Sequence, residues 1–112
     1  MSKLHKSDIK IAVELDDNRV PEAIKWTARD GGVANEQAKA MLLSLWDPNA
    51  QETVRIDLWT KDMPVDEMQK FFHQTLVGMT ESFKRATGND KMAATMKDFT
   101  DYFAEHLELK KE

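Results

Sequence analysis

The strongest constraint on the fold is a change in hydrophobic period near Pro64. Before Pro64, apolar side chains recur at every second residue, as in residues 9–15. After Pro64, they recur at intervals of three and four residues. Period two is typical of a strand with one buried face, and a period near 3.6 is typical of an amphipathic helix. The sequence therefore predicts an α+β protein in which strands come first and helices follow.

Four strands are expected in the first half of the chain. They cover residues 9–15, a segment that opens at Pro21, residues 38–46 and residues 53–60. Turn residues lie between them, namely Asp16-Asp17-Asn18, Arg29-Asp30-Gly31-Gly32 and Asp47-Pro48-Asn49. Short connections favour an antiparallel meander. The third strand is apolar on both faces, which favours a central position in the sheet or one that is covered on both sides.

Two helices are expected in the second half. The first follows Pro64 and ends at Gly88, because glycine readily closes a helix. The second begins at Asn89 or Asp90, either of which can cap it. The predicted fold is a four-stranded, mainly antiparallel sheet followed by two C-terminal helices packed on one face, all in a single domain, 1–112. The side chains expected to be mostly buried are Ile11, Val13, Trp26, Ile56, Leu58, Phe72, Met79, Phe99 and Phe103.

Composition argues against several classes of function. The net charge is −4 and the lysines are scattered among acids, so a nucleic-acid-binding surface is not expected. The chain has no cysteine, which removes disulfides and thiolate zinc sites and favours the cytoplasm. The first residues lack the apolar region of a signal peptide, and no apolar run is long enough to span a membrane.

No catalytic, cofactor-binding or metal-binding residues are predicted. The three histidines, His5, His73 and His106, do not share a helical ligand spacing, and we expect each at the surface. The paired acids lie in a turn or in the first turn of a helix, where those roles explain them. We therefore expect a protein that is not an enzyme.

One face of the last two strands carries unusual apolar content. Trp59 shares strand parity with Arg55 and Asp57, opposite Val54, Ile56 and Leu58. If Leu43 pairs near Ile56, then Leu42 and Trp46 join that face. Two helices cover only one side of a sheet, so this face is a candidate protein-contact surface. Equally, loops or the N-terminal arm could cover it. The candidate residues are Leu42, Trp46, Arg55, Asp57 and Trp59.

The chain also resembles a known family over nearly its whole length. The segments that carry the resemblance are RIDLWTKDMPVDEMQKFFHQTL (residues 55–76), MKDFTDYFAEHLEL (96–109), IAVELDDNRVPEAIKWTARDGG (11–32) and KAMLLSLWD (39–47). They closely resemble the gliding motility protein GldC family, so residues 1–112 are expected to form one GldC-like domain.

The resemblance implies a small cytoplasmic accessory protein of bacterial gliding motility, with no enzymatic activity and no cofactor. Its implied partners are other proteins of the gliding machinery. The face that carries Leu42, Trp46 and Trp59 would serve either such a partner or self-association in a homodimer. The alternatives are a peptide-binding adaptor, which takes an extended segment in an apolar groove or at a sheet edge, and a small enzyme or ligand-binding domain.

Overall fold

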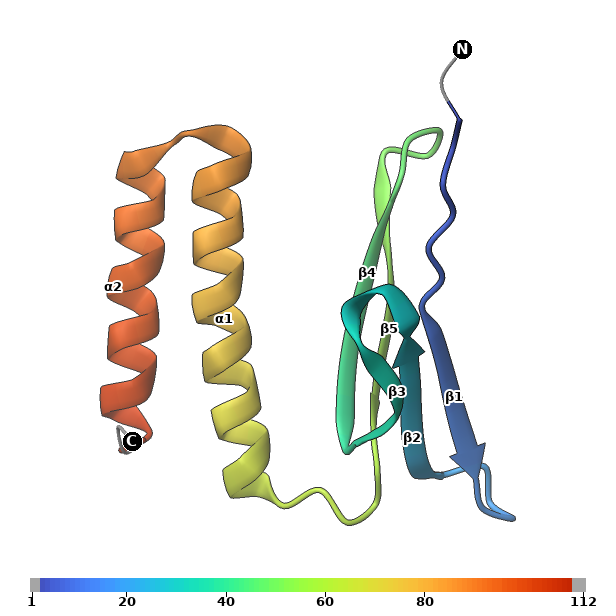
Figure 1. Cartoon of the computed structure of the whole chain (residues 1–112). Coiled ribbons are helices and arrows are strands. Elements are labelled where there is room, and N and C mark those ends of the chain that lie inside the picture. The colour runs from blue at the N-terminus through green and yellow to red at the C-terminus, as the bar shows by residue number, and fades with distance from the viewer. Residues whose placement is uncertain (1–2, 110–112) are drawn as a thin grey trace. The chain divides into compact units, whose positions relative to one another are not determined.

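The structure is a computed structural model that describes residues 3–109. The strands are β1 (Lys10–Leu15), β2 (Pro21–Ala28), β3 (Val33–Ala38), β4 (Ala40–Asp47) and β5 (Glu52–Trp59), with a short 3-10 helix, η1 (Arg29–Gly31), between β2 and β3. The helices are α1 (Val65–Thr87) and α2 (Asp90–His106) (Figure 1). The chain divides into a strand unit and a helical unit between Met63 and Pro64. The predicted α+β class and the predicted change from strands to helices near Pro64 are confirmed.

The first sheet has the order β1-β2-β3 and is antiparallel throughout. Its middle strand places Ile24 opposite Val13 on one side and Ala38 on the other. Ile24 is 1% exposed and is the most completely buried large side chain of the described residues. Val13 and Ala38 point to the same face as Ile24 and flank its side chain, and burial this complete also needs groups packed over that face.

The predicted single four-stranded sheet is wrong, because residues 3–109 form five strands in two sheets. The sequence of β3, VANEQA, has one strongly β-forming residue, and its polar residues favour turns or helices. It nevertheless pairs with β2 because η1 and Gly32, at φ 75°, reverse the chain beside that strand. The chain then bends at Lys39, where pairing with β2 ends and pairing with β5 begins.

The second sheet is the antiparallel hairpin β4-β5. Its register pairs Leu43 with Ile56, which is the pairing that the sequence argument assumed. Asp47 closes the turn because its Oδ1 accepts the N–H groups of Asn49 at 2.9 Å and Ala50 at 3.2 Å. Within residues 3–109, β4 pairs with β5 alone, so the central position expected for this strand is wrong.

The two helices form a hairpin closed by Gly88 and Asn89 (Figure 1). Gly88 has φ 70°, and the Asn89 side chain accepts the Met92 N–H at 2.9 Å, which confirms both sequence signals. The small residues Ala93 and Thr100 are buried. The His73 ring stacks on Phe103 with centroids 6.1 Å apart, so His73 is half-buried rather than a free surface histidine.

The predicted core is only partly confirmed. Four of its nine members are half-buried, namely Val13, Trp26, Leu58 and Phe103. The other five are exposed in the structure: Ile11, Ile56, Phe72, Met79 and Phe99. Hydrophobic periodicity identifies an apolar face, but burial also needs something packed on that face. The packing of both helices on one face of a sheet stays a prediction.

Candidate protein-contact surface

The β4-β5 hairpin brings the five candidate contact residues onto one face. Leu42 lies directly opposite Asp57, and the neighbouring pairs are Ala40 with Trp59, Ser44 with Arg55 and Trp46 with Thr53. Paired residues of a ladder point to the same side, and the side alternates along the strand. We call the set Leu42, Trp46, Arg55, Asp57 and Trp59 the tryptophan face.

Both indoles of the tryptophan face are accessible. Trp46 is 60% exposed and Trp59 is 51% exposed, while Leu42 is half-buried. A tryptophan side chain presents a large apolar area together with one N–H donor. The two indoles at opposite ends of the hairpin therefore offer two apolar anchor points, with Leu42 between them on the same face.

A salt bridge lies between the two tryptophans. The Arg55 guanidinium is 2.7 Å from the Asp57 carboxylate, and the two residues are two positions apart on one strand. Exposed pairs of this kind contribute little to stability, because solvent screens them. The pair instead places polar, hydrogen-bonding groups in the middle of the face, next to Leu42 and Ser44.

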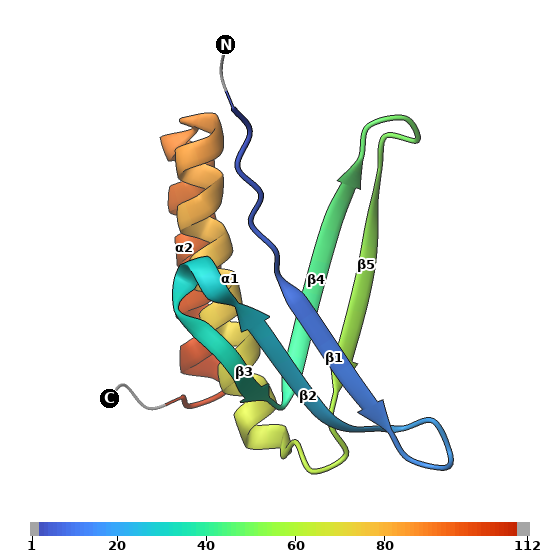
Figure 2. The ribbon, with the colours of Figure 1, turned by 45° about the vertical axis from the view of Figure 1, so that its right-hand side comes forward.

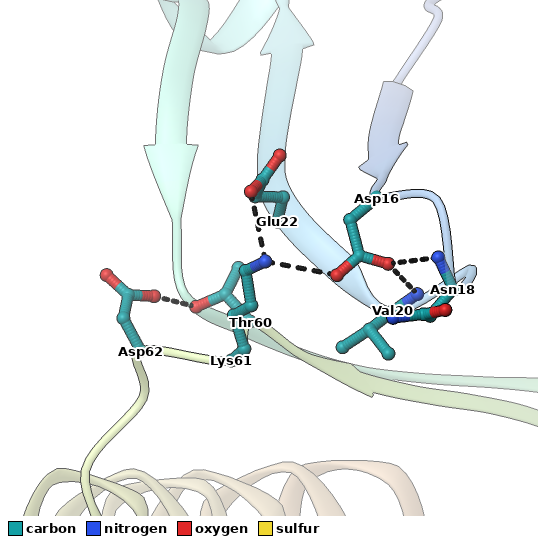
Figure 3. Close-up of polar contacts among 7 residues, drawn as sticks. All are labelled: Asp16, Asn18, Val20, Glu22, Thr60, Lys61 and Asp62. Carbon is teal, nitrogen blue, oxygen red and sulfur yellow. Dashed lines mark hydrogen bonds and ion pairs between the residues drawn. The ribbon is translucent and has the colours of Figure 1, made fainter.

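A separate polar cluster surrounds Lys61 (Figure 3). The Lys61 ammonium lies 3.0 Å from Asp16 Oδ2 and 3.1 Å from Glu22 Oε1. The other oxygen of Asp16 accepts the N–H groups of Asn18 at 2.8 Å and Val20 at 3.0 Å. Sequence reasoning assigned Asp16 to a turn, correctly, but did not identify Lys61, which lies 45 residues further along the chain.

The contacts in this cluster shift the pKa values of Asp16 and Lys61. The Val20 N–H and then the Lys61 ammonium hold the pKa of Asp16 below its ordinary value. Hydrogen bonds to Asp16 and then Glu22 raise the pKa of Lys61. Nearby, the Thr60 hydroxyl donates to Asp62 at 2.5 Å and lowers the pKa of that carboxyl. These shifts favour the charged forms of Asp16, Lys61 and Asp62, which suits a link between the β1-β2 turn and the end of β5 rather than acid–base chemistry.

The surface of the described residues also has hollows, of which one lies between the helices and one lies in the strand unit. A groove of about 260 Å³ lies between α1 and α2 and is almost wholly apolar, lined among others by Leu76, Met79, Met96 and Phe99. A polar hollow of about 390 Å³ in the strand unit has Lys6, Lys10, Arg29, Asp8 and Asp30 among its lining residues. The part of the chain that the structure describes contains no group of three or more histidine, cysteine or acidic residues placed to hold a metal ion.

Neither helix in residues 3–109 combines the length and apolarity that a membrane crossing requires. Among families, the model described as gliding motility-associated protein GldC-like matches residues 21–109 of the chain. That span includes the tryptophan face, Lys61 and both helices. No curated protein and no solved structure matches the chain.

Proposed function

The chain belongs to the GldC-like family of gliding motility-associated proteins, and on that premise we propose that it is a non-enzymatic accessory component that acts through protein contacts. The proposed location is the cytoplasm, and the proposed partners are other proteins of the gliding machinery. The proposed contact site is the tryptophan face. The observation that carries this assignment is the exposure of two tryptophans on one face of a short hairpin.

The chemistry of the tryptophan face favours a protein partner. Trp is enriched among the residues that dominate binding energy at interfaces, where it fills a pocket and excludes water from polar neighbours. The exposed Arg55–Asp57 pair supplies directional hydrogen-bonding groups beside these anchors. Large exposed apolar areas on single proteins commonly mark such interaction sites.

The test compares Trp59→Ala with Val54→Ala. Val54 is 54% exposed on the opposite face of the same strand, so its truncation removes a similarly accessible apolar group from outside the tryptophan face. Both variants are expected to remain folded by thermal unfolding. In pull-downs from a gliding bacterium, read by mass spectrometry, Trp59→Ala is expected to weaken partner binding by about 2 kcal/mol or more. Val54→Ala is expected to retain the same partners.

Two outcomes contradict this assignment. If Trp59→Ala unfolds the strand unit, the residue is part of the core and the parity argument fails. If it stays folded and binds every partner as the native chain does, then the tryptophan face is not the contact surface. The strand edges and the outer faces of the helices then become the candidates.

The groove between α1 and α2 supports a second candidate function, a peptide-binding adaptor. Its methionines, Met79 and Met96, are flexible enough to accommodate different apolar side chains. Met79 is exposed at the groove, so Met79→Lys is expected to block an apolar peptide while leaving the buried Ala93 and Thr100 seam intact. If this variant binds apolar peptides as tightly as the native chain does, the groove between α1 and α2 is not the peptide-binding site.

A further inference from the structure

Strand β4 combines features that rarely occur together on one sheet edge. It pairs with β5 on one side only, in the described part of the chain, and Figure 2 shows the two strands side by side. Six consecutive residues, 40–45, contain no charge and no proline. An unpaired edge of this kind is a template for another strand, and natural proteins normally protect it.

The other three strand edges are protected in ordinary ways. The ladders of β1 and β3 with β2 contain register irregularities, between Glu14 and Leu15 and between Trp26 and Ala28, which interrupt a flat edge. On β5, Arg55 and Asp57 place charges in the middle of the strand. Among the strands of residues 3–109, only β4 presents an even ladder without a charge along most of its length.

The direction of the peptide groups on β4 follows from the ladder. Hydrogen-bonded pairs alternate with non-hydrogen-bonded pairs in an antiparallel sheet. The Thr60 N–H donates to the Lys39 carbonyl at 2.8 Å, and at the turn the Gln51 N–H donates to the Asp47 carbonyl at 2.9 Å. The N–H and C=O groups of the odd-numbered residues of β4 therefore point toward β5. The N–H and C=O groups of the even-numbered residues point to the outer edge, and these residues are Ala40, Leu42, Ser44 and Trp46.

We propose that β4 pairs antiparallel with β4 of a second copy of this chain, around a two-fold axis at Leu43. In this register Ala40 pairs with Trp46 of the second copy, and Leu42 pairs with Ser44. All four even-numbered residues then meet even-numbered residues, so the outward N–H and C=O groups of both copies find partners. The result is a continuous four-stranded sheet, β5-β4-β4-β5. The proposal concerns a strand edge, and it does not depend on what the tryptophan face binds.

Charge complementarity selects this register. With Leu43 on the axis, Lys39 of one copy lies opposite Asp47 of the other, at both ends of the paired strands. A shift by two residues in either direction keeps the parity of the peptide groups but places Lys39 opposite Leu45 or Asp47 opposite Met41. Opposite charges therefore pair in the register centred on Leu43, and the two shifted registers lack this pairing.

Pairing through β4 stops at two copies and arranges the tryptophans. The outer strands of the joined sheet are both β5, which carries Arg55 and Asp57 and resists further addition. On the tryptophan face, Trp59 of one copy and Trp46 of the other flank Ala40. Two strand spacings, about 10 Å, separate the two indoles, and the small Ala40 side chain leaves room between them.

The first test is the state of association of the native chain and of Ser44→Pro. Sedimentation of the native chain is expected to give twice the 12.9 kDa chain mass at high concentration. Proline at position 44 removes an outward N–H from each copy without removing a bond to β5. It is expected to raise the dissociation constant about ten- to a hundredfold, while far-UV circular dichroism shows that the variant remains folded. A native chain that stays monomeric, or a folded Ser44→Pro variant with the native dissociation constant, overturns the proposal.

The second test uses the absence of cysteine from the chain. Leu43→Cys places two thiols opposite each other across the axis in a non-hydrogen-bonded pair, where Cα atoms are about 4.5 Å apart and a disulfide can form. Leu45→Cys is the control, because Leu45 is more exposed but lies opposite Met41 of the second copy, more than ~10 Å from the other Leu45. Mild oxidation is expected to cross-link Leu43→Cys at least tenfold faster. Equal rates, or faster cross-linking of Leu45→Cys, reject the register even if Ser44→Pro does not fold.

Discussion

Replacing Ile24 by alanine is expected to destabilise the strand unit by about 3 kcal/mol. Ile24 is 1% exposed and lies in the middle strand between Val13 and Ala38. The substitution removes three carbon atoms, at about 0.8 kcal/mol each for the lost transfer free energy. Neighbouring strands are held by their ladders and cannot fully close the space, so the residual cavity adds to this cost.

Urea unfolding followed by tryptophan fluorescence measures this change in the right part of the molecule. All three tryptophans, Trp26, Trp46 and Trp59, lie in the strand unit, so their emission reports its unfolding. Circular dichroism at 222 nm follows mainly the helices and serves as an independent signal. The fluorescence transition is therefore expected to shift in Ile24→Ala.

Two matched variants make the result decisive. Ile24→Val removes one carbon and is expected to cost about 0.5–1.5 kcal/mol. Ile9→Ala makes the same chemical change at a residue that is 70% exposed, and is expected to cost less than about 1 kcal/mol. Equal losses in Ile24→Ala and Ile9→Ala, or a loss below about 1 kcal/mol in Ile24→Ala, would refute the burial of Ile24 as the centre of this unit.

Three further predictions concern the polar cluster and the helical hairpin. The pKa of Asp16 is lower in the folded chain than in the unfolded chain, so its stabilising effect is present above about pH 4 and is lost as the pH falls through the folded pKa. In the native chain the urea midpoint of unfolding is expected to fall between pH 7 and pH 3, and in Asp16→Asn it is expected to fall less. An equal fall in both chains would assign this acid sensitivity to other carboxyls. Asn89→Ala is expected to lower the stability of the helical hairpin by about 1 kcal/mol in thermal circular dichroism, because the Met92 N–H loses its cap. Gly88→Ala is expected to cost about 1 kcal/mol, because alanine disfavours φ 70°, and an unchanged midpoint would contradict that strain.

The sequence by itself determined the features that depend on neighbouring residues. The change of period at Pro64 separates strands from helices, because side-chain spacing directly reflects backbone geometry. Gly88 and Asn89 end and begin the helices, because one needs a left-handed backbone and the other a side-chain acceptor. The same local logic placed Trp59 with Arg55 and Asp57, since alternation along a strand has no exceptions within a regular ladder.

Tertiary structure alone decided which strands pair and which apolar faces are covered. β3 forms from a polar sequence because β2 offers an edge beside it, and no property of VANEQA reveals that edge. Lys61 reaches Asp16 because two distant turns meet, a contact without any sequence spacing. Likewise β4 is apolar on both faces, which favours a central strand, yet within the described residues it pairs with β5 alone. Pairing between distant segments depends on every other segment that competes for the same edge, so a local pattern specifies the face of a strand but not its neighbour.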